Sequence, residues 1–335
     1  MKTSDFDYPL PDEKIAYHPL KDRQNSKLMV LDRENHSILH KRFYELVELL
    51  CPGDLLIFNN TKVIPARIYG KKKSGVEIEI LLLERLDGNR WKCLARKPKE
   101  GALIEFEEGL TGTLSRTDGG EWTIDFSEDV TTYLNKCGKM PLPPYIKREA
   151  EEGDKVTYQT VYAEREGAAA APTAGLHFTP GLIEEIEKRG IETGYVTLHV
   201  GLGTFLPVKE EDVSNHVMHS EYIEVPKRTA DLVNKAKKEG RRVIAVGTTV
   251  VRTLESSIDD EALLKENSGR TELFITPGYE FKIVDALITN FHLPCSTLLM
   301  LVSAFAGKEY IFQAYEEALH GDYRFLSYGD AMLIC

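Results

Sequence analysis

Short alternating runs of apolar and polar residues fill the chain between about residues 62 and 130. Gly, Asp and Asn separate the runs, and no long helical pattern interrupts them. A period of two is typical of half-buried strands, and short strands at this spacing favour a small closed or nearly closed barrel. The predicted strands are Val63–Tyr69, Val76–Leu83, Arg90–Ala95, Leu103–Phe106, Gly112–Ser115 and Trp122–Phe126, followed by a short helix at Asp129–Asn135.

Longer strands and helices alternate on both sides of this segment, which predicts an α/β fold with a mixed or parallel sheet. The predicted strands are Leu28–Asp32, Leu55–Asn59, Tyr195–Val200, Arg242–Val246, Glu272–Ile275 and Val284–Asn290. The predicted helices are Phe43–Leu50, Lys227–Glu239, Thr248–Ser256, Ser296–Ala306 and Tyr310–His320. We therefore expect a discontinuous α/β domain, residues 1–61 and 149–335, with a β-barrel domain inserted at 62–148. The proline-rich stretch Met140–Tyr145 predicts a stiff second crossing.

The stretch Gly167–Thr179 has neither a strand composition nor a loop composition. It carries no charge and consists mainly of small residues. The site candidates within it are Pro172, Thr173, Gly175 and His177. Thr179 and Pro180 then predict a helix start, and Gly190 its end. A tight uncharged loop before a helix N-terminus favours a site for a polar or anionic ligand group. The alternative is a close-packed crossover with a core histidine.

The residues after the predicted strands form a second pattern. They are rich in Gly, Thr, Asn and His, a composition that suits a neutral hydrogen-bonding site for a small organic ligand. In α/β folds, ligands lie beyond the carboxyl ends of strands, so these loops are expected to converge on one cleft. The candidates are Asn60, Thr61 and Lys62; His199, Gly201, Gly203 and Thr204; Thr248, Thr249 and Arg252; and Asn290 and His292.

Several common site motifs are missing from the sequence. No Gly-x-x-x-x-Gly-Lys phosphate loop and no Gly-x-Ser-x-Gly nucleophile motif occurs, and Gly201-Leu-Gly203 lacks a third glycine. His216, His219 and Glu221 are too few and too irregular to predict a metal centre, so no metal site is expected. The segment Tyr323–Asp330 is either a packed C-terminal cap or a stacking surface for a base.

Composition narrows the class of protein. The chain has 335 residues, 42% of them apolar and 28% charged, which is typical of a soluble globular protein. The start of the chain lacks a secretory signal, and the apolar stretch Leu298–Ala306 is too short to span a bilayer. The five cysteines are scattered and odd in number. They favour a reducing cytoplasm and argue against a structural zinc.

Charge is distributed unevenly along the chain. The net charge of −11 argues against a nucleic-acid partner, yet 62–99 holds eleven Lys and Arg against four Asp and Glu. The segment 227–242 holds seven against two. These runs are either solvated surfaces or places that bind phosphates. The candidate RNA-binding residues are Lys71, Lys72, Lys73, Arg96, Lys97 and Lys99, together with Arg67, and we expect them on the rim of the cleft.

A set of long motifs spans the chain from Asp5 to Leu333. They are Asp5–Pro11, Phe58–Arg67, Met140–Ile146, Tyr158–Ala163, Ala171–Thr179, Thr197–Phe205, Ala245–Thr249, Ile288–Pro294 and Ser327–Leu333. Together they resemble the S-adenosylmethionine:tRNA ribosyltransferase-isomerase family of queuosine biosynthesis. One departure is Ala169, where the family pattern has Val. The resemblance implies an α/β domain carrying an inserted β-barrel, in agreement with the pattern above.

The resemblance also implies a reaction. A ribosyl unit passes from S-adenosylmethionine to 7-aminomethyl-7-deazaguanine at the wobble position of a tRNA, and adenine and methionine are released. S-adenosylmethionine is then a substrate, and no cofactor or metal is expected. A monomer without membrane contact is expected. The runner-up functions are a cofactor-independent sugar or nucleotide hydrolase and a non-catalytic RNA-binding protein.

This chemistry needs a general base, a general acid and a group that binds the methionine carboxylate. The candidates for proton transfer are His177, His199 and His292, and the carboxylates Asp330 and Glu221. Arg252, one turn into a predicted helix, suits the methionine carboxylate. The sequence does not rank these roles.

Overall fold

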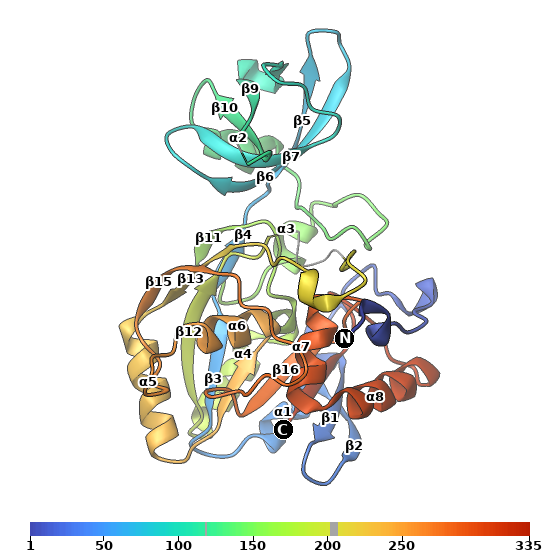
Figure 1. The fold of residues 1–335 in the computed structure, drawn as a ribbon, viewed down its shortest axis with the longest axis vertical. Helices are drawn as coiled ribbons and strands as arrows, with labels where there is room; N and C mark the ends of the chain where they lie inside the picture. Colours follow the sequence, from blue (N-terminus) through green and yellow to red (C-terminus); the bar gives the residue numbers. More distant parts are fainter. Residues whose placement is uncertain (118, 202–206) are drawn as a thin grey trace.

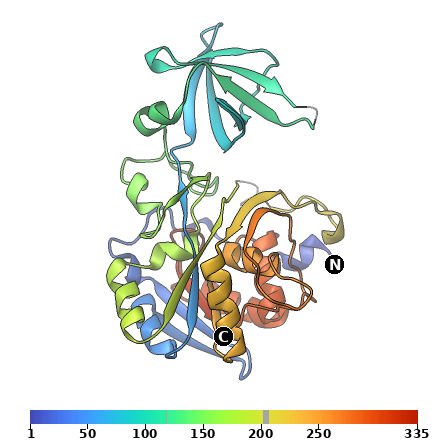
Figure 2. The same cartoon turned by 90° about the vertical axis from the view of Figure 1, so that its left-hand side faces the viewer.

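The computed structural model describes residues 1–117, 119–201 and 207–335. Within these ranges a β-barrel stands at one end of a larger α/β unit (Figure 1). The same arrangement seen after a quarter turn shows extended chain linking the two parts (Figure 2). No helix of the described chain has the length and apolar character that would be needed to cross a membrane.

Among the described residues, nine strands form the large sheet in the order β15-β13-β12-β3-β14-β16-β17-β1-β2. The neighbours β12, β3, β14 and β16 run parallel to one another at its centre. The strands are β1 (Lys27–Asp32), β2 (Ser37–Arg42), β3 (Leu55–Asn59), β12 (Glu192–Leu198), β13 (Glu221–Val225), β14 (Val243–Val246), β15 (Asn267–Thr271), β16 (Ala286–Asn290) and β17 (Ala331–Ile334).

Two hydrophobic cores cover the two faces of this sheet. Along β3, Leu55 and Ile57 belong to one core, whereas Leu56 and Phe58 belong to the other, because successive side chains point to opposite faces. The first core holds α5 (Lys227–Lys238), α6 (Thr248–Glu255), α7 (Thr297–Ala306) and α8 (Lys308–His320). The second holds α1 (Leu46–Leu49) and α4 (Pro180–Lys188). Strands buried on both faces read as continuous apolar runs, as β3 and β14 do.

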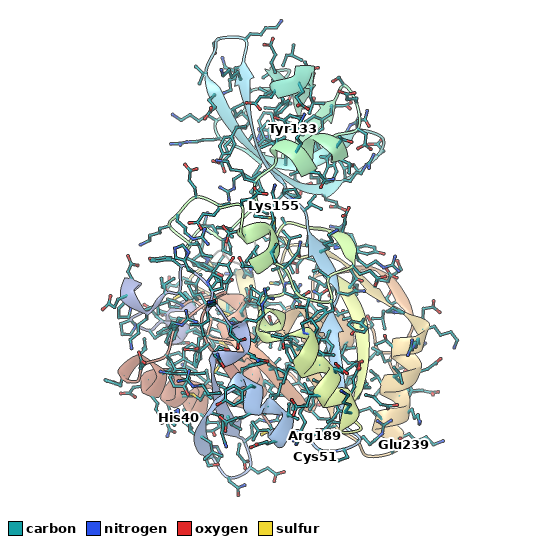
Figure 3. All side chains as sticks on the ribbon, turned by 180° about the vertical axis from the view of Figure 1, so that it is seen from behind. His40, Cys51, Tyr133, Lys155, Arg189 and Glu239 are labelled. Carbon is teal, nitrogen blue, oxygen red and sulfur yellow. The ribbon has the colours of Figure 1, made fainter. Side chains whose placement is uncertain are left out.

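The direction of the central strands decides where a site can form. Cys51, Arg189 and Glu239 precede β3, β12 and β14, and Figure 3 places all three at the end of the molecule remote from the barrel. Tyr133, which belongs to the barrel core, lies at the opposite end. The carboxyl ends of the parallel strands therefore point toward the barrel side of the α/β unit.

The barrel closes through the strand order β10-β7-β6-β5-β8-β9. Its apolar interior, with Ile80, Ile104 and Ile124 fully buried, is separate from the two cores of the large sheet. Its elements are β5 (Arg67–Lys72), β6 (Glu77–Arg85), β7 (Arg90–Ala95), β8 (Leu103–Glu105), β9 (Thr111–Arg116), β10 (Trp122–Phe126) and α2 (Thr131–Cys137). A two-stranded ribbon of β4 (Thr61–Val63) and β11 (Arg165–Ala168), and the short α3 (Asp154–Thr157), lie between the barrel and the large sheet.

The predicted fold class is confirmed, and most predicted elements agree within two or three residues. The predicted strand Val63–Tyr69 is wrong: Pro65 divides it between β4 and β5, because proline cannot donate to a ladder. The predicted strand Glu272–Ile275 is also wrong, since the polar segment β15 forms the edge instead. The helix predicted at Phe43–Leu50 is a 3-10 turn followed by the single turn α1. The division into 1–61 with 149–335 and 62–148 stays a prediction.

Candidate functional site

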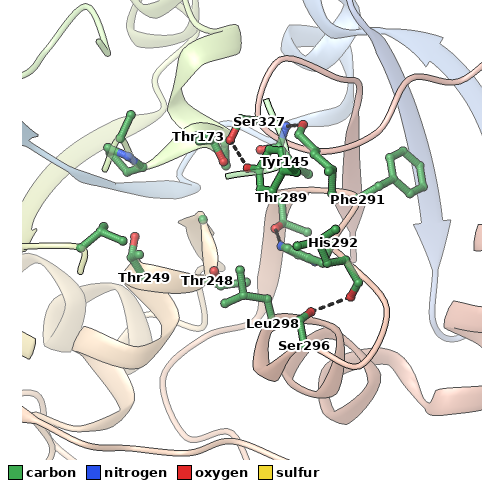
Figure 4. A pocket seen from close by; sticks show the side chains of 18 residues that line it. Tyr145, Thr173, Thr248, Thr249, Thr289, Phe291, His292, Ser296, Leu298 and Ser327 are labelled. Carbon is green, nitrogen blue, oxygen red and sulfur yellow. Dashed lines mark hydrogen bonds between the residues drawn. The ribbon is translucent and has the colours of Figure 1, made fainter. Parts of the chain in front are cut away.

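A pocket lies at the carboxyl ends of β14 and β16 and encloses about 600 Å³, its open mouth included. The loop before α4 forms one side, and the starts of α6 and α7 form another (Figure 4). Its walls come from 171–174, 247–249, 289–293, Ser296, Leu298, Leu326, Ser327, Tyr145 and Val200.

The pocket wall is uncharged. Among the described residues that line it there is no Asp, Glu, Lys or Arg. Two titratable rings line it: burial lowers the pKa of His292 to about 3 and raises the pKa of Tyr145, so both stay neutral at physiological pH. Hydroxyl groups, among them those of Thr173, Thr248 and Thr289, supply side-chain polarity. Such a wall suits an organic molecule with few charges, or a cation that Lys and Arg would repel.

Two helices begin at this pocket. Gly247 has φ +100°, which favours glycine, and leads the chain from β14 directly into α6. Ser296 caps α7, and its Oγ accepts from the Leu299 N–H at 3.2 Å. The first N–H groups of a helix have no partner within it and carry a partial positive charge. The pocket therefore offers donors to an anionic group although its side chains are neutral.

His292 sits in this wall with both ring nitrogens near hydroxyl groups. Its Nε2 lies 3.2 Å from Thr289 Oγ1, and its Nδ1 lies 3.4 Å from Tyr315 Oη. The backbone N–H of His292 donates to the same tyrosine oxygen at 2.9 Å. These contacts fix the ring at the pocket, and its lowered pKa keeps it neutral at physiological pH.

Asn290 and His177 form the partition behind the pocket. Asn290 Nδ2 donates to Leu326 O at 3.2 Å and lies 3.1 Å from His177 Nε2. Since an amide nitrogen can only donate, His177 Nε2 accepts, and its Nδ1–H donates to Ser26 Oγ at 2.8 Å. His177 is stacked on Phe43, and its pKa is lowered to about 3 by burial and by the cations Arg324 and Arg23. Asn290 thus fixes a neutral imidazole between two recesses.

A family model described as "Queuosine biosynthesis protein" matches residues 3–334. The chain is 52% identical to the S-adenosylmethionine:tRNA ribosyltransferase-isomerase of Thermotoga maritima and 51% identical to that of Trichlorobacter lovleyi, with 100% of each chain covered. The chain belongs to this family of ribosyltransferase-isomerases. It is therefore a transferase, and the resemblance inferred from the motifs is confirmed.

A solved structure of the ribosyltransferase-isomerase family supports the fold. The crystal structure of S-adenosylmethionine tRNA ribosyltransferase from Thermotoga maritima is 41% identical to the chain, with a TM-score of 0.58. The match covers 99% of this chain and 100% of that one.

We expected the loops at 59–62, 171–179, 199–205, 247–252 and 289–297 to line one cleft, and this expectation is wrong in part, since 59–62 does not contribute to the pocket. Pro172, Thr173, Thr248, Thr249, Asn290 and His292 do line the pocket. His177 lies behind the partition, and His199 does not line the pocket either, although its neighbour Val200 does. Successive side chains of an extended segment point to opposite sides, so Val200 and His199 cannot share one recess. His199 instead stacks on Tyr222, and its Nδ1 lies 2.8 Å from Thr61 Oγ1.

Arg252 and Glu221 pair with each other rather than with the pocket. Arg252 Nη1 donates to Glu221 Oε2, and both side chains are buried. The second oxygen, Glu221 Oε1, accepts from the Gly201 N–H at 3.1 Å. Neither side chain lines the pocket. Arg252 already has a buried carboxylate partner, so this geometry gives no support to its expected role at a methionine carboxylate, which stays a prediction.

The remaining candidates have structural contacts. Both Asp330 oxygens accept backbone N–H groups, from Lys27 and Arg324 at 2.8 Å, although burial raises the pKa of Asp330. Gly175 packs so closely on Tyr162 that a Cβ would lie 2.0 Å from its hydroxyl. Further contacts join Asn60 to Glu164 and Thr197, Lys62 to Glu166, and Arg67 to Glu79. Gly203 and Thr204 lie outside the described residues. The catalytic and binding roles of all these residues stay predictions.

The basic residues at the tip of the barrel are not on the rim of the pocket, whereas Arg67, at the start of β5, lines a groove with Pro143 and Pro144. Lys71, Lys72 and Lys73 occupy the tip of the β5–β6 hairpin, which both views place at the outer end of the barrel (Figures 1 and 2). Arg96, Lys97 and Lys99 follow β7 beside this tip, where Lys72 Nζ donates to Lys97 O at 2.9 Å. The rim position was wrong because β5 runs outward from Arg67, so its last residues are carried away from the α/β unit. RNA binding by these residues stays a prediction.

One residue that the sequence did not single out organises the strand ends. Asn59, the last residue of β3, is fully buried; its Nδ2 donates to Leu198 O at 3.0 Å and to Thr249 Oγ1 at 3.2 Å. Its Oδ1 accepts from the Thr61 and Leu198 N–H groups. A polar residue at the end of an apolar strand was the available signal. The prediction from the sequence named the neighbouring Asn60 as the site residue instead.

Proposed function

We propose that this family member transfers and isomerises the ribosyl unit of S-adenosylmethionine onto 7-aminomethyl-7-deazaguanine at the wobble position of tRNA. The products are epoxyqueuosine in tRNA, adenine and methionine. The observation that supports the proposal most directly is the uncharged pocket with two helix N-termini, in a chain that belongs to this family. We also infer a cytoplasmic monomer that needs no cofactor.

S-adenosylmethionine fits the distribution of charge in this pocket. Its carboxylate would be bound by the first N–H groups of α6 or α7, at Thr248 and Thr249 or beside Ser296. Its sulfonium cation would meet no Lys or Arg among the described lining residues. Instead it would lie near hydroxyl oxygens and the ring of Tyr145.

His292 is the best-placed histidine for proton transfer at the 5′ carbon. The sulfonium acidifies the hydrogens on that carbon, and a base that removes one leaves an ylide-like carbanion. Its collapse opens the ribose ring and expels adenine, which needs a proton from a general acid. A base must be unprotonated before it acts, and burial keeps His292 in that form, although the same lowered pKa makes its ring a weak base.

The second half of the reaction requires a neutral amine. The aminomethyl group attacks the former anomeric carbon with its lone pair, and closure of the epoxide then expels methionine. An alkylammonium ion has no lone pair, so a site with little charge and little water favours the reactive form by lowering the pKa of the amine. The same uncharged wall thus serves both halves of the reaction.

The deciding experiment measures adenine and methionine release by the purified protein. S-adenosylmethionine is supplied with tRNA that carries the aminomethyl base, and with a matched tRNA that carries guanine at that position. We expect release only with the modified tRNA. Release with neither tRNA would contradict the proposal and favour a non-catalytic RNA-binding protein. Release with both, or without tRNA, would favour a hydrolase.

A further inference from the structure

A second recess lies on the other side of the segment Leu326–Gly329. It is narrow and open at the surface, with about 290 Å³ of space between its walls when the open solvent at its mouth is included. Ser327 lines both this recess and the uncharged pocket, and it lies 2.5 Å from Tyr145 Oη at their boundary. The residues that give the second recess its character are Arg23, Arg324, Ser26, His177 and Tyr328.

The two arginines of this recess have no carboxylate partner among the described residues. Arg23 Nη1 donates to Gln159 O at 3.1 Å, and Arg324 Nη1 donates to His18 O at 3.4 Å. By contrast, Arg148 and Arg242 each form a two-point contact with an aspartate. Both recess arginines are only half-exposed. Their positive charge is therefore not cancelled by a direct ion pair.

Two buried carboxylates that contact residues of this recess are already engaged. Asp330 accepts two backbone N–H groups, and Asp154 accepts from both Arg148 nitrogens and from the Tyr328 hydroxyl. The charge of the two arginines reaches into the recess, since both lower the pKa of His177 beyond the effect of burial. A recess with two cations, hydroxyl groups and a neutral imidazole is suited to an oxyanion.

We propose that Arg23 and Arg324 bind a backbone phosphate of the tRNA strand that carries the target base. This inference rests on the proposed function. A target base that reaches the pocket must leave its stack, and the phosphates beside it then lie near the pocket mouth. The arginine recess adjoins that mouth through Ser327, and an arginine fork matches two phosphate oxygens.

A neighbouring basic groove supports a phosphate over the carboxylate of S-adenosylmethionine. Arg67, Lys139, Lys147 and Arg148 line a groove beneath the barrel together with Pro143, Pro144 and Ile146. These last three flank Tyr145, which lines the uncharged pocket. Each of these four cations also pairs with a carboxylate, so the groove adds partly neutralised positive charge on the far side of the Tyr145–Ser327 contact, where a strand of phosphates would continue. A single carboxylate needs only one site, and the helix N-termini supply it.

The test is the affinity for an anticodon stem-loop RNA with the aminomethyl base, measured without S-adenosylmethionine at several salt concentrations. The variants are Arg23→Gln, Arg324→Gln and the double change, with exposed Arg189→Gln, at the end of the molecule remote from the barrel, as the matched control. Each recess change should raise the Kd for RNA about tenfold, as expected for one charge-assisted contact. The double change should lower the salt slope by about one, because both arginines neutralise the same phosphate, and the control should change neither quantity. The Kd for S-adenosylmethionine should stay within about twofold of the parent, because the recess contacts RNA alone.

Two results would overturn the inference. One is an unchanged RNA affinity and salt slope in a double variant with the circular dichroism spectrum and melting temperature of the parent. The other is weaker binding of S-adenosylmethionine that decarboxylated S-adenosylmethionine does not show, which would place the carboxylate at the arginines. Arg23→Lys with Arg324→Lys retains the charge and removes the fork, so it should recover part of the RNA affinity. The adenine assay tests the proposed function separately, because RNA binding is measured here without the reaction.

Discussion

Two recesses share Ser327 and differ in almost every other respect. The pocket in front of the Leu326–Gly329 segment is built from strand ends and helix starts, and no charged side chain is found among its described lining. The recess behind it is built from the N-terminal and C-terminal loops and holds two arginines. His177 and Asn290 stand between them.

The difference shows how one site can serve a sulfonium cation and a polyanion. An arginine in the pocket would repel the sulfonium cation of S-adenosylmethionine. It would also attract the methionine carboxylate to the place that the sulfonium should occupy. Helix N-termini attract an anion with dipoles alone, so the wall stays neutral. The arginines lie outside, where a phosphate can reach them. Under this proposal an acidic chain, with a net charge of −11, binds RNA through two arginines that have no carboxylate partner among the described residues.

The largest expected effect comes from putting a negative charge into the neutral pocket. Thr248→Asp should raise the KM for S-adenosylmethionine roughly 100-fold, because two like charges near 4 Å repel by up to about 4 kcal/mol at a protein surface. The helix itself should tolerate the change, since an acid in the first turn is favourable. The neutral variant Thr248→Asn should raise KM far less. Equal KM values in the Asp and Asn variants would show that the carboxylate binds elsewhere.

A smaller effect concerns the two buried histidines. The pKa values of His177 and His292 are about 3 in the fold against 6.5 for free histidine, so the fold favours their neutral forms. Their contribution to stability is fully present above about pH 6.5 and is lost as the pH falls toward 3. Between about pH 7 and pH 5, each histidine should remove about 2 kcal/mol from the free energy of unfolding.

Urea denaturation of the parent and His177→Asn at both pH values measures this effect. Between about pH 7 and pH 5, the free energy of unfolding should fall by about 2 kcal/mol less in the His177→Asn variant than in the parent. Exposed His320→Asn is the control and should lose as much as the parent. If His177→Asn is as acid-sensitive as the parent, the imidazole between the two recesses is not held neutral by the fold.

The smallest expected effect separates the barrel tip from the groove beneath the barrel. Changing Lys71, Lys72 and Lys73 together to Ala should weaken tRNA binding about threefold and lower its salt slope, as exposed charge contacts do. Lys139→Ala with Lys147→Ala should weaken it more, because that groove adjoins the pocket through Tyr145. Neither change should alter binding of S-adenosylmethionine. A triple variant that binds more weakly than the pair would place the main RNA contact at the tip.

Much of the fold was predictable because local pattern and tertiary burial agree. The central strands β3, β14 and β16 are fully buried and mainly apolar, with Asn59 and Asn290 as the last residues of β3 and β16. Helix α4 has the predicted cap, with Thr179 Oγ1 accepting from the Leu182 N–H at 3.2 Å. The edge strand β15 was missed because the sequence Asn267–Thr271 carries no apolar alternation. Its pairing with β13 places it at the edge of the large sheet.

The site was predictable in part for a similar reason. Residues directly after parallel strands meet by topology, so Thr248, Asn290 and His292 were found from position alone. Side-chain direction was not available from the sequence, and His199 therefore entered the set wrongly placed. Arg23 and Arg324 are 301 positions apart and belong to no shared motif. Only the folded chain brings them to one recess.

A crystal structure with S-adenosylmethionine bound tests most directly whether the uncharged pocket, and not the arginine recess, binds S-adenosylmethionine. The methionine carboxylate should lie within about 3.2 Å of the backbone N–H groups of Thr248, Thr249 or the first turn of α7, with the ribose near His292. The arginine recess should contain no part of the ligand. A carboxylate bound by Arg23 and Arg324 would contradict the account, since the cationic recess would then belong to the small substrate and not to the RNA.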